Sequence, residues 1–181
     1  VLGLRWRASS WAFVALVLIL AAPAHGTPGF WDDNLDTADF VASMTDEELL
    51  GQVLMLGYLG SEPTDEFLEW IGDWNVGGVK IFGWNTGDLE GLARGVGAMQ
   101  KVAVSKRMDI PLFVATDQEG GWVRHVKGPT SISAGNLAIG ASGIALDAYQ
   151  SGNIIGQELR VLGINMNFAP TVDIYTNPEA H

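Results

Sequence analysis

The sequence predicts an α/β fold in which about four strands alternate with helices around a parallel sheet. Short apolar runs indicate the strands, and helical periodicity marks the stretches between them. The alternation suits either a small open sheet or the N-terminal half of a (β/α)8 TIM-type barrel, which needs roughly 250 residues when complete. We favour the half-barrel because polar motifs follow the third and fourth strands and the chain stops at His181 without a closing helix.

The first predicted helix begins at a capping box formed by Thr45 and Glu48. A strand at 53–56 follows, and a second helix at 64–74 leads to a second strand at 79–82. One face of the second helix is predicted, from the 3.6-residue spacing, to hold Phe67, Trp70, Ile71 and Trp74.

Thr86 is predicted to cap the third helix, which precedes a strand at 112–116. A long helix at 145–162 ends at Gly163, and the fourth strand follows at 164–168. The inward face of that long helix is predicted to hold Tyr149, Ile155, Leu159 and Leu162.

The composition of the 181 residues, 48% hydrophobic with a formal charge of −11, indicates an acidic globular protein. Arg5 and Arg7 are the only charged residues in the first 24, so the rest is more acidic still. Such a surface repels nucleic acid and anionic lipid. The absence of cysteine excludes disulfides, thiolate catalysis and Cys-ligated zinc, and the three histidines lack metal-ligand spacing, so we expect no metal.

Residues 1–24 are predicted to be a secretory signal peptide, in which a basic start precedes a short apolar run and the small-x-small site Ala22-Pro23-Ala24. A spanning helix needs roughly 20 apolar residues, and this run is shorter. We therefore expect an exported protein, periplasmic or extracellular, whose single domain occupies 25–181. An uncleaved membrane anchor is the alternative.

The stretch 117–121, Asp-Gln-Glu-Gly-Gly, directly follows the third strand. A carboxylate there points into the mouth of a parallel sheet, and paired glycines allow a sharp turn close to a ligand. Asp117 is therefore a candidate to accept hydrogen bonds from sugar hydroxyls, or else it caps the amides of its own loop. A second hypothesis is that Asp117 and Glu119 form a catalytic carboxylate pair. Neighbouring turn residues seldom flank a bond from opposite sides, and this disfavours the pair relative to sugar binding by Asp117.

Six motifs run through the chain in the order 51–52, 76–79, 111–121, 135–140, 156–159 and 163–173. Together they resemble the N-terminal domain of glycoside hydrolase family 3, and within it the β-N-acetylhexosaminidases, over roughly 45–181. The resemblance implies a (β/α)8-type barrel that hydrolyses a terminal β-linked sugar with retention and without a cofactor. It implies that Asp117 binds hydroxyls of the −1 sugar and that Glu119, Gly120 and Gly121 organise the loop, with Asp173 in a supporting role.

The resemblance also indicates a departure and an omission. Relatives often carry Arg-Val-Gln-Arg after the two glycines, and the last arginine contacts substrate. Here Trp122, Arg124 and His125 lie in that stretch, so Arg124 or His125 is expected to supply the donor. Trp122 and Trp84 are candidates either to stack on a sugar or to pack. The family's histidine acid/base and aspartate nucleophile are expected downstream of His181, so no catalytic residue is assigned within the chain.

These observations predict an exported β-N-acetylhexosaminidase-like enzyme whose partner is a GlcNAc-containing carbohydrate, such as peptidoglycan fragments or chitooligosaccharides. Three alternatives remain open: a β-glucosidase-type member of the family, a non-catalytic sugar-binding homologue, and a small α/β domain that folds as it stands. The sequence does not set the oligomeric state.

Overall fold

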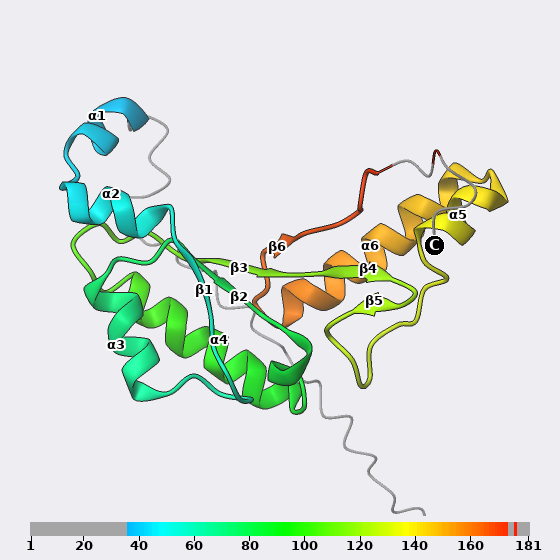
Figure 1. Ribbon diagram of the computed structural model, residues 1–181, viewed down its shortest axis with the longest axis horizontal. Coiled ribbons are helices and arrows are strands. Elements are labelled where there is room, and N and C mark those ends of the chain that lie inside the picture. The colour runs from blue at the N-terminus through cyan, green and yellow to red at the C-terminus, as the bar shows by residue number, and fades with distance from the viewer. Residues whose placement is uncertain (1–35, 174–175, 177–181) are drawn as a thin grey trace, which may run out of the picture. The chain divides into compact units, whose positions relative to one another are not determined.

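The computed structural model describes residues 36–173 and 176, so the predicted signal peptide lies outside the described residues. Four strands form one parallel sheet in the order β1-β2-β3-β6, and β4 and β5 form a separate antiparallel hairpin (Figure 1). The elements are α1 Thr37–Ala42, α2 Asp46–Gln52, β1 Met55–Gly57, α3 Asp65–Asp73, β2 Gly78–Lys80, η1 Gly83–Asn85, α4 Leu89–Ala103, β3 Phe113–Thr116, β4 Gln118–Gly120, β5 Val123–Arg124, α5 Asn136–Ser142, α6 Ala145–Val161 and β6 Met166–Asn167.

The sheet confirms the α/β prediction with strands that alternate with helices. Helices α3, α4 and α6 each connect two neighbouring parallel strands, and the strands keep their order along the chain. Consecutive strands of a (β/α)8 barrel have this arrangement. The described residues supply four strands of such a sheet and do not close it.

The helix starts follow from their capping residues. Thr45 accepts the amide of Glu48, and the Glu48 carboxylate accepts the amide of Thr45, which completes the predicted capping box. Thr64 caps α3 with a single bond, in which its hydroxyl accepts the amide of Phe67 at 3.2 Å. The prediction for Thr86 is wrong: Asp88 caps α4, because the chain first makes the short turn η1.

The core lies between the sheet and helices α3, α4 and α6. Val79, Ile81 and Val114 share one face of the sheet and belong to the same buried cluster as residues of all three helices. Figure 1 shows α3 and α4 side by side against this face. From α3, α4 and α6 the cluster takes Phe67, Ile71, Leu92, Val96, Met99, Ile155 and Leu159.

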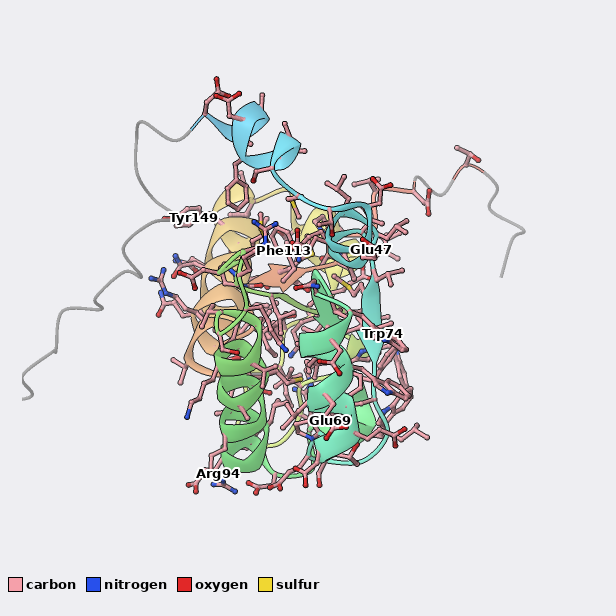
Figure 2. All side chains as sticks on the ribbon, turned by 90° about the vertical axis from the view of Figure 1, so that its left-hand side faces the viewer. Glu47, Glu69, Trp74, Arg94, Phe113 and Tyr149 are labelled. Atoms are coloured by element: carbon pink, nitrogen blue, oxygen red, sulfur yellow. The ribbon has the colours of Figure 1, made fainter. Side chains whose placement is uncertain are left out.

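The apolar face of α3 is only partly buried, and the predicted core position of Tyr149 is wrong. Trp70 and Trp74 are 40% and 49% exposed and stack on each other with ring centroids 5.3 Å apart, because only the Phe67 and Ile71 side of α3 meets the sheet. Tyr149 is 70% exposed near the start of α6, where that helix lies beside α5 (Figures 1 and 2). The later positions Ile155, Leu159 and Leu162 are buried as predicted.

The opposite face of the sheet carries a different set of side chains. Because side chains alternate along a strand, Lys80 and its register partner Ala115 point away from the face that holds Val79 and Val114. On this second face Phe113 and Phe168 remain 57% and 45% exposed (Phe113 is labelled in Figure 2). In a closed barrel this face is the packed interior, and its carboxyl end is where active sites lie.

Candidate functional site

Asp117 lies immediately after β3, at the carboxyl edge of the parallel sheet. The strand before it is held firmly, since Thr116 is fully buried and its hydroxyl donates to the carbonyl of Ile81 at 3.1 Å. Alternation from Ala115 places the Asp117 side chain on the face opposite the helices. The Asp117 side chain is 30% exposed, so it is open to solvent.

The hairpin of β4 and β5 returns the chain to Asp117. The amide of His125 donates to the Asp117 carbonyl at 3.3 Å. The buried side chain of Gln118 clamps the returning strand, because its Nε2 donates to the Val126 carbonyl and its Oε1 accepts the Val126 amide. As a result His125 Nδ1 lies 3.7 Å from Asp117 Oδ2. Nδ1 is buried and has no hydrogen-bond partner among the described residues.

Lys80 is the residue of this site that the sequence analysis missed. Its Nζ lies 2.5 Å from Asp117 Oδ2, and its side chain is 13% exposed. The same Nζ is 4.7 Å from the ring centroid of Phe168 and 5.4 Å from that of Phe82. The sequence signal that could have found it is a single cation within the apolar run Val79-Lys80-Ile81. Strand pairing is needed to show that this cation lies on the same face of the sheet as Asp117.

Gly120 and Gly121 turn the hairpin through left-handed backbone conformations, with φ of 88° and 56°. A Cβ on Gly120 would lie 1.8 Å from the Ser133 hydroxyl, and one on Gly121 would lie 3.1 Å from the Gly135 Cα. The amide of Gly121 also donates to the Ser133 carbonyl at 3.1 Å. The paired glycines therefore allow two backbone segments to meet, as only glycine permits here.

Glu119 contacts other groups than Asp117 does. Its carboxylate accepts the backbone amide of Thr171 at 3.0 Å, the Thr171 hydroxyl at 2.9 Å and the Asn136 amide group at 3.1 Å. These bonds join the hairpin to α5 and to the segment after β6. Glu119 thus has its acceptor oxygens occupied, whereas the carboxylate of Asp117 accepts no backbone amide among the described residues.

The other candidates make contacts of their own. Trp122 stands at the hairpin tip and is completely exposed, and Arg124 donates to the Ser131 carbonyl at 3.3 Å. Asp173 is exposed beyond β6. Trp84 stacks on Phe82 with centroids 4.5 Å apart, and its Nε1 donates to the Tyr58 carbonyl at 2.9 Å.

Polar side chains tie the loops around Asp117 together. Asn85 is fully buried and donates to the carbonyls of Tyr58 and Gly60, which links the loops after β1 and β2. The Thr86 hydroxyl donates to the His125 carbonyl at 2.9 Å, which links the β2 loop to the hairpin. Loops that follow three strands are therefore held as one unit around the carboxylate.

The asparagines of the 163–173 motif align β3 with β6. Asn165 accepts the Val114 amide at 2.8 Å and donates to the Leu112 carbonyl at 3.0 Å. Asn167 likewise accepts the Gln118 amide at 2.9 Å and donates to the Gln118 carbonyl at 3.1 Å. Each side-chain amide thus reproduces a backbone hydrogen-bond pair and sets where Asp117 lies relative to Phe168.

A groove of about 820 Å³ lies between α5, α6 and the segment after β6. Glu119, Asn136 and Thr171 line its polar side, and Ile139 and Ile155 contribute to its apolar side. Asp117, His125 and Lys80 do not line this groove, so it is separate from the Asp117 site. Over the described ranges 36–173 and 176, no group of three or more His, Asp or Glu side chains is placed to hold a metal ion.

The fold and this site define an α/β protein with a carboxylate at the carboxyl edge of a parallel sheet. The model of the glycosyl hydrolase family 3 N-terminal domain matches residues 44–181, so the chain belongs to glycoside hydrolase family 3. It is 35% identical over 155 residues to beta-hexosaminidase A of Pseudoalteromonas piscicida, covering 75% of this chain and 26% of that protein. It is 33% identical to a beta-N-acetylglucosaminidase/beta-glucosidase of Cellulomonas fimi, covering 76% and 22%.

The fold matches solved structures of the same family. The family 3 beta-N-acetylglucosaminidase of Paenibacillus sp. str. FPU-7 superposes with a TM-score of 0.68 at 39% identity, over 73% of this chain and 25% of that one. The chain thus spans about a quarter of the length of these relatives.

Two further relatives carry a location in their names: an uncharacterized secreted glycosyl hydrolase of Arthroderma benhamiae and a periplasmic beta-glucosidase of Salmonella typhimurium. Within the part of the chain that the structure covers, no helix is long and apolar enough to cross a membrane.

Proposed function

We propose that this chain is the substrate-binding first part of a retaining β-N-acetylhexosaminidase that acts on GlcNAc-containing glycans. The observation that carries the proposal is the Asp117 carboxylate, partly exposed at the carboxyl edge of the sheet and held by Lys80. The relatives named beta-hexosaminidase and beta-N-acetylglucosaminidase support the sugar class. Chitooligosaccharides and peptidoglycan fragments carry that sugar.

The proposed reaction is a double displacement at the anomeric carbon. A carboxylate attacks that carbon while an acid protonates the departing oxygen, and water then releases the sugar from the enzyme with the same group acting as base. We place the acid/base and the nucleophile in sequence beyond His181, because the matched part of this chain covers only about a quarter of each of these relatives. Asp117 accepts hydrogen bonds from hydroxyls of the sugar being transferred, with His125 or Arg124 as donor beside it.

The test is Asp117→Asn in the full-length protein, assayed on a chromogenic β-GlcNAc substrate. Two charged hydrogen bonds of about 1.5–3 kcal/mol each are weakened, so kcat/KM should fall at least about 100-fold. Asp73→Asn is the matched control, since Asp73 is an exposed carboxylate at the end of α3 and its ion pair among the described residues is with Lys106, which follows α4. An Asp117→Asn enzyme as active as the control would contradict the role of Asp117.

A β-glucosidase activity is the second candidate, favoured by the names of the Cellulomonas and Salmonella relatives and by His125 at the expected arginine position. Assaying the full-length protein on matched β-GlcNAc and β-glucoside substrates separates the two. Binding of N-acetylglucosamine without turnover of either substrate would instead indicate a non-catalytic sugar-binding homologue.

We also propose that residues 1–24 direct export and are removed after Ala24. The basic start, the short apolar run and the Ala-Pro-Ala site support this, as do the relatives named secreted and periplasmic. Mass spectrometry of the protein recovered from a bacterial host distinguishes a mature chain that begins at His25 from an uncleaved, membrane-anchored one.

A further inference from the structure

We propose that Lys80 is a positioning residue of the sugar site, which orients the Asp117 carboxylate so that Oδ2 is held by the protein and Oδ1 faces the ligand. The proposal rests on the function proposed above. It adds a role for Lys80 of β2, whose side chain acts through Asp117 and need not contact the sugar.

Both neighbouring cationic side chains approach the same oxygen of the Asp117 carboxylate. Lys80 Nζ lies 2.5 Å from Asp117 Oδ2, and His125 Nδ1 lies 3.7 Å from the same oxygen. The described residues place both cation-forming side chains at Oδ2 and none at Oδ1. A carboxylate with one oxygen held this way retains a free acceptor with a defined direction, which a bound hydroxyl needs.

The ammonium group of Lys80 is held between two aromatic rings. Only 13% of the Lys80 side chain is exposed, and the rings of Phe82 and Phe168 flank Nζ at 5.4 Å and 4.7 Å. A cation near two aromatic faces loses few orientations when it binds the carboxylate. Surface ion pairs lack this restraint, as the exposed pair of Lys106 and Asp73 at 3.5 Å illustrates.

The register of the parallel strands brings Lys80 and Asp117 together. Lys80 pairs with Ala115, and Ala115 pairs with Met166, so Lys80 at the end of β2 lies on the same face as Asp117 and Phe168, which directly follow β3 and β6. Phe82 follows two residues after Lys80 and extends the same face. The sheet therefore sets the position of Lys80 beside Asp117, and side chains held by strands are placed more precisely than side chains held by loops.

The experiment is a double-mutant cycle with Lys80→Met, Asp117→Asn and the double variant in the full-length protein. Methionine keeps the length and apolar stem of lysine between the two rings, so thermal unfolding should stay within a few degrees of the unmodified protein. We expect Lys80→Met to lower kcat/KM on the β-GlcNAc substrate about 10- to 100-fold, and Lys80→Arg to restore part of it. In the Asp117→Asn background the same change should cost about threefold or less.

Lys106→Met serves as the control, because it removes a lysine whose ion pair with Asp73 is partly exposed and lies away from Asp117 at the ends of α3 and α4. Equal losses from Lys80→Met in both Asp117 backgrounds would overturn the proposal, since they indicate a structural role. If the protein binds N-acetylglucosamine but does not hydrolyse the β-GlcNAc substrate, the proposed activity is wrong. The double-mutant cycle then still tests Lys80, with the dissociation constant for N-acetylglucosamine as its readout. A protein that neither binds nor hydrolyses overturns both.

Discussion

Glu48 shows how one side chain joins two distant parts of the chain. It completes the capping box of α2 and also accepts hydrogen bonds from the Arg107 guanidinium, which lies between α4 and β3. Arg107 donates to the Ser43 carbonyl as well. The Arg107 hydrogen bonds, followed by that from the Thr45 amide, hold the pKa of Glu48 below its ordinary value of 4.5, although burial opposes them.

A carboxyl whose pKa is lowered by folding adds stability above its ordinary pKa, and this stability is lost as pH falls through the lowered value. Glu48→Gln should therefore lower the urea midpoint of the full-length protein at pH 7, and the difference from the unmodified protein should shrink as pH falls below 4.5 and through the lowered pKa of Glu48. Glu47→Gln is the control, because Glu47 is an exposed neighbour on α2 (Figure 2). A Glu48→Gln deficit that persists unchanged at low pH would show that the ion pair is not its source.

At the scale of elements, glycines decide which backbones approach each other. A Cβ on Gly51 in α2 would lie 1.8 Å from the Trp74 carbonyl oxygen, and one on Gly77 would lie 2.0 Å from that of Gln52. The Gly77 amide donates to the Gly51 carbonyl at 2.9 Å, and Gln52 Nε2 donates to the Asn75 carbonyl at 2.8 Å. These contacts seat α2 against the turn that starts β2.

Gly51→Ala should therefore destabilise the full-length protein by roughly 3 kcal/mol, because backbone atoms cannot move aside as a side chain would. Gly97→Ala should instead stabilise it by roughly 0.5–1 kcal/mol, since Gly97 lies within α4 and an added Cβ meets nothing within 4 Å. Urea unfolding of both variants measures the two effects. Changes of equal size and sign would contradict the role assigned to the α2 contact.

For the whole molecule, the described sheet has two strands, β1 and β6, that pair on one side only. Its face away from the helices exposes Met55, Phe113 and Phe168. Unpaired strand edges and exposed apolar faces promote association between chains. A complete barrel would cover both.

We accordingly expect the 181-residue chain by itself to hydrolyse no β-GlcNAc substrate, to self-associate in size-exclusion chromatography with light scattering, and to bind a hydrophobic dye. The full-length protein should show the opposite behaviour in each measurement. Cooperative unfolding of a monomeric chain would support the alternative of an independent α/β domain, and turnover of the chromogenic substrate would place the catalytic groups within these residues.

Local patterns predicted the helices well and the strands less well. The caps at Thr45 and Thr64 and the end of α6 at Gly163 follow from short-range hydrogen bonds, which the local sequence specifies. The strands proved shorter than their apolar runs, and β1 begins at Met55 because α2 continues to Gln52. The hairpin β4–β5 and the helices α1 and α5 were not predicted, because they lie in polar or glycine-rich stretches without clear periodicity.

By itself the sequence determined the alternation of strands and helices and the position of Asp117 directly after a strand. Both depend on neighbours along the chain, namely caps, periodicity and turn residues. Only the tertiary structure decided which face of α3 is buried and which cation meets Asp117. Lys80 reaches that carboxylate because parallel strands pair in a particular register, and such pairing depends on contacts between segments far apart in the sequence.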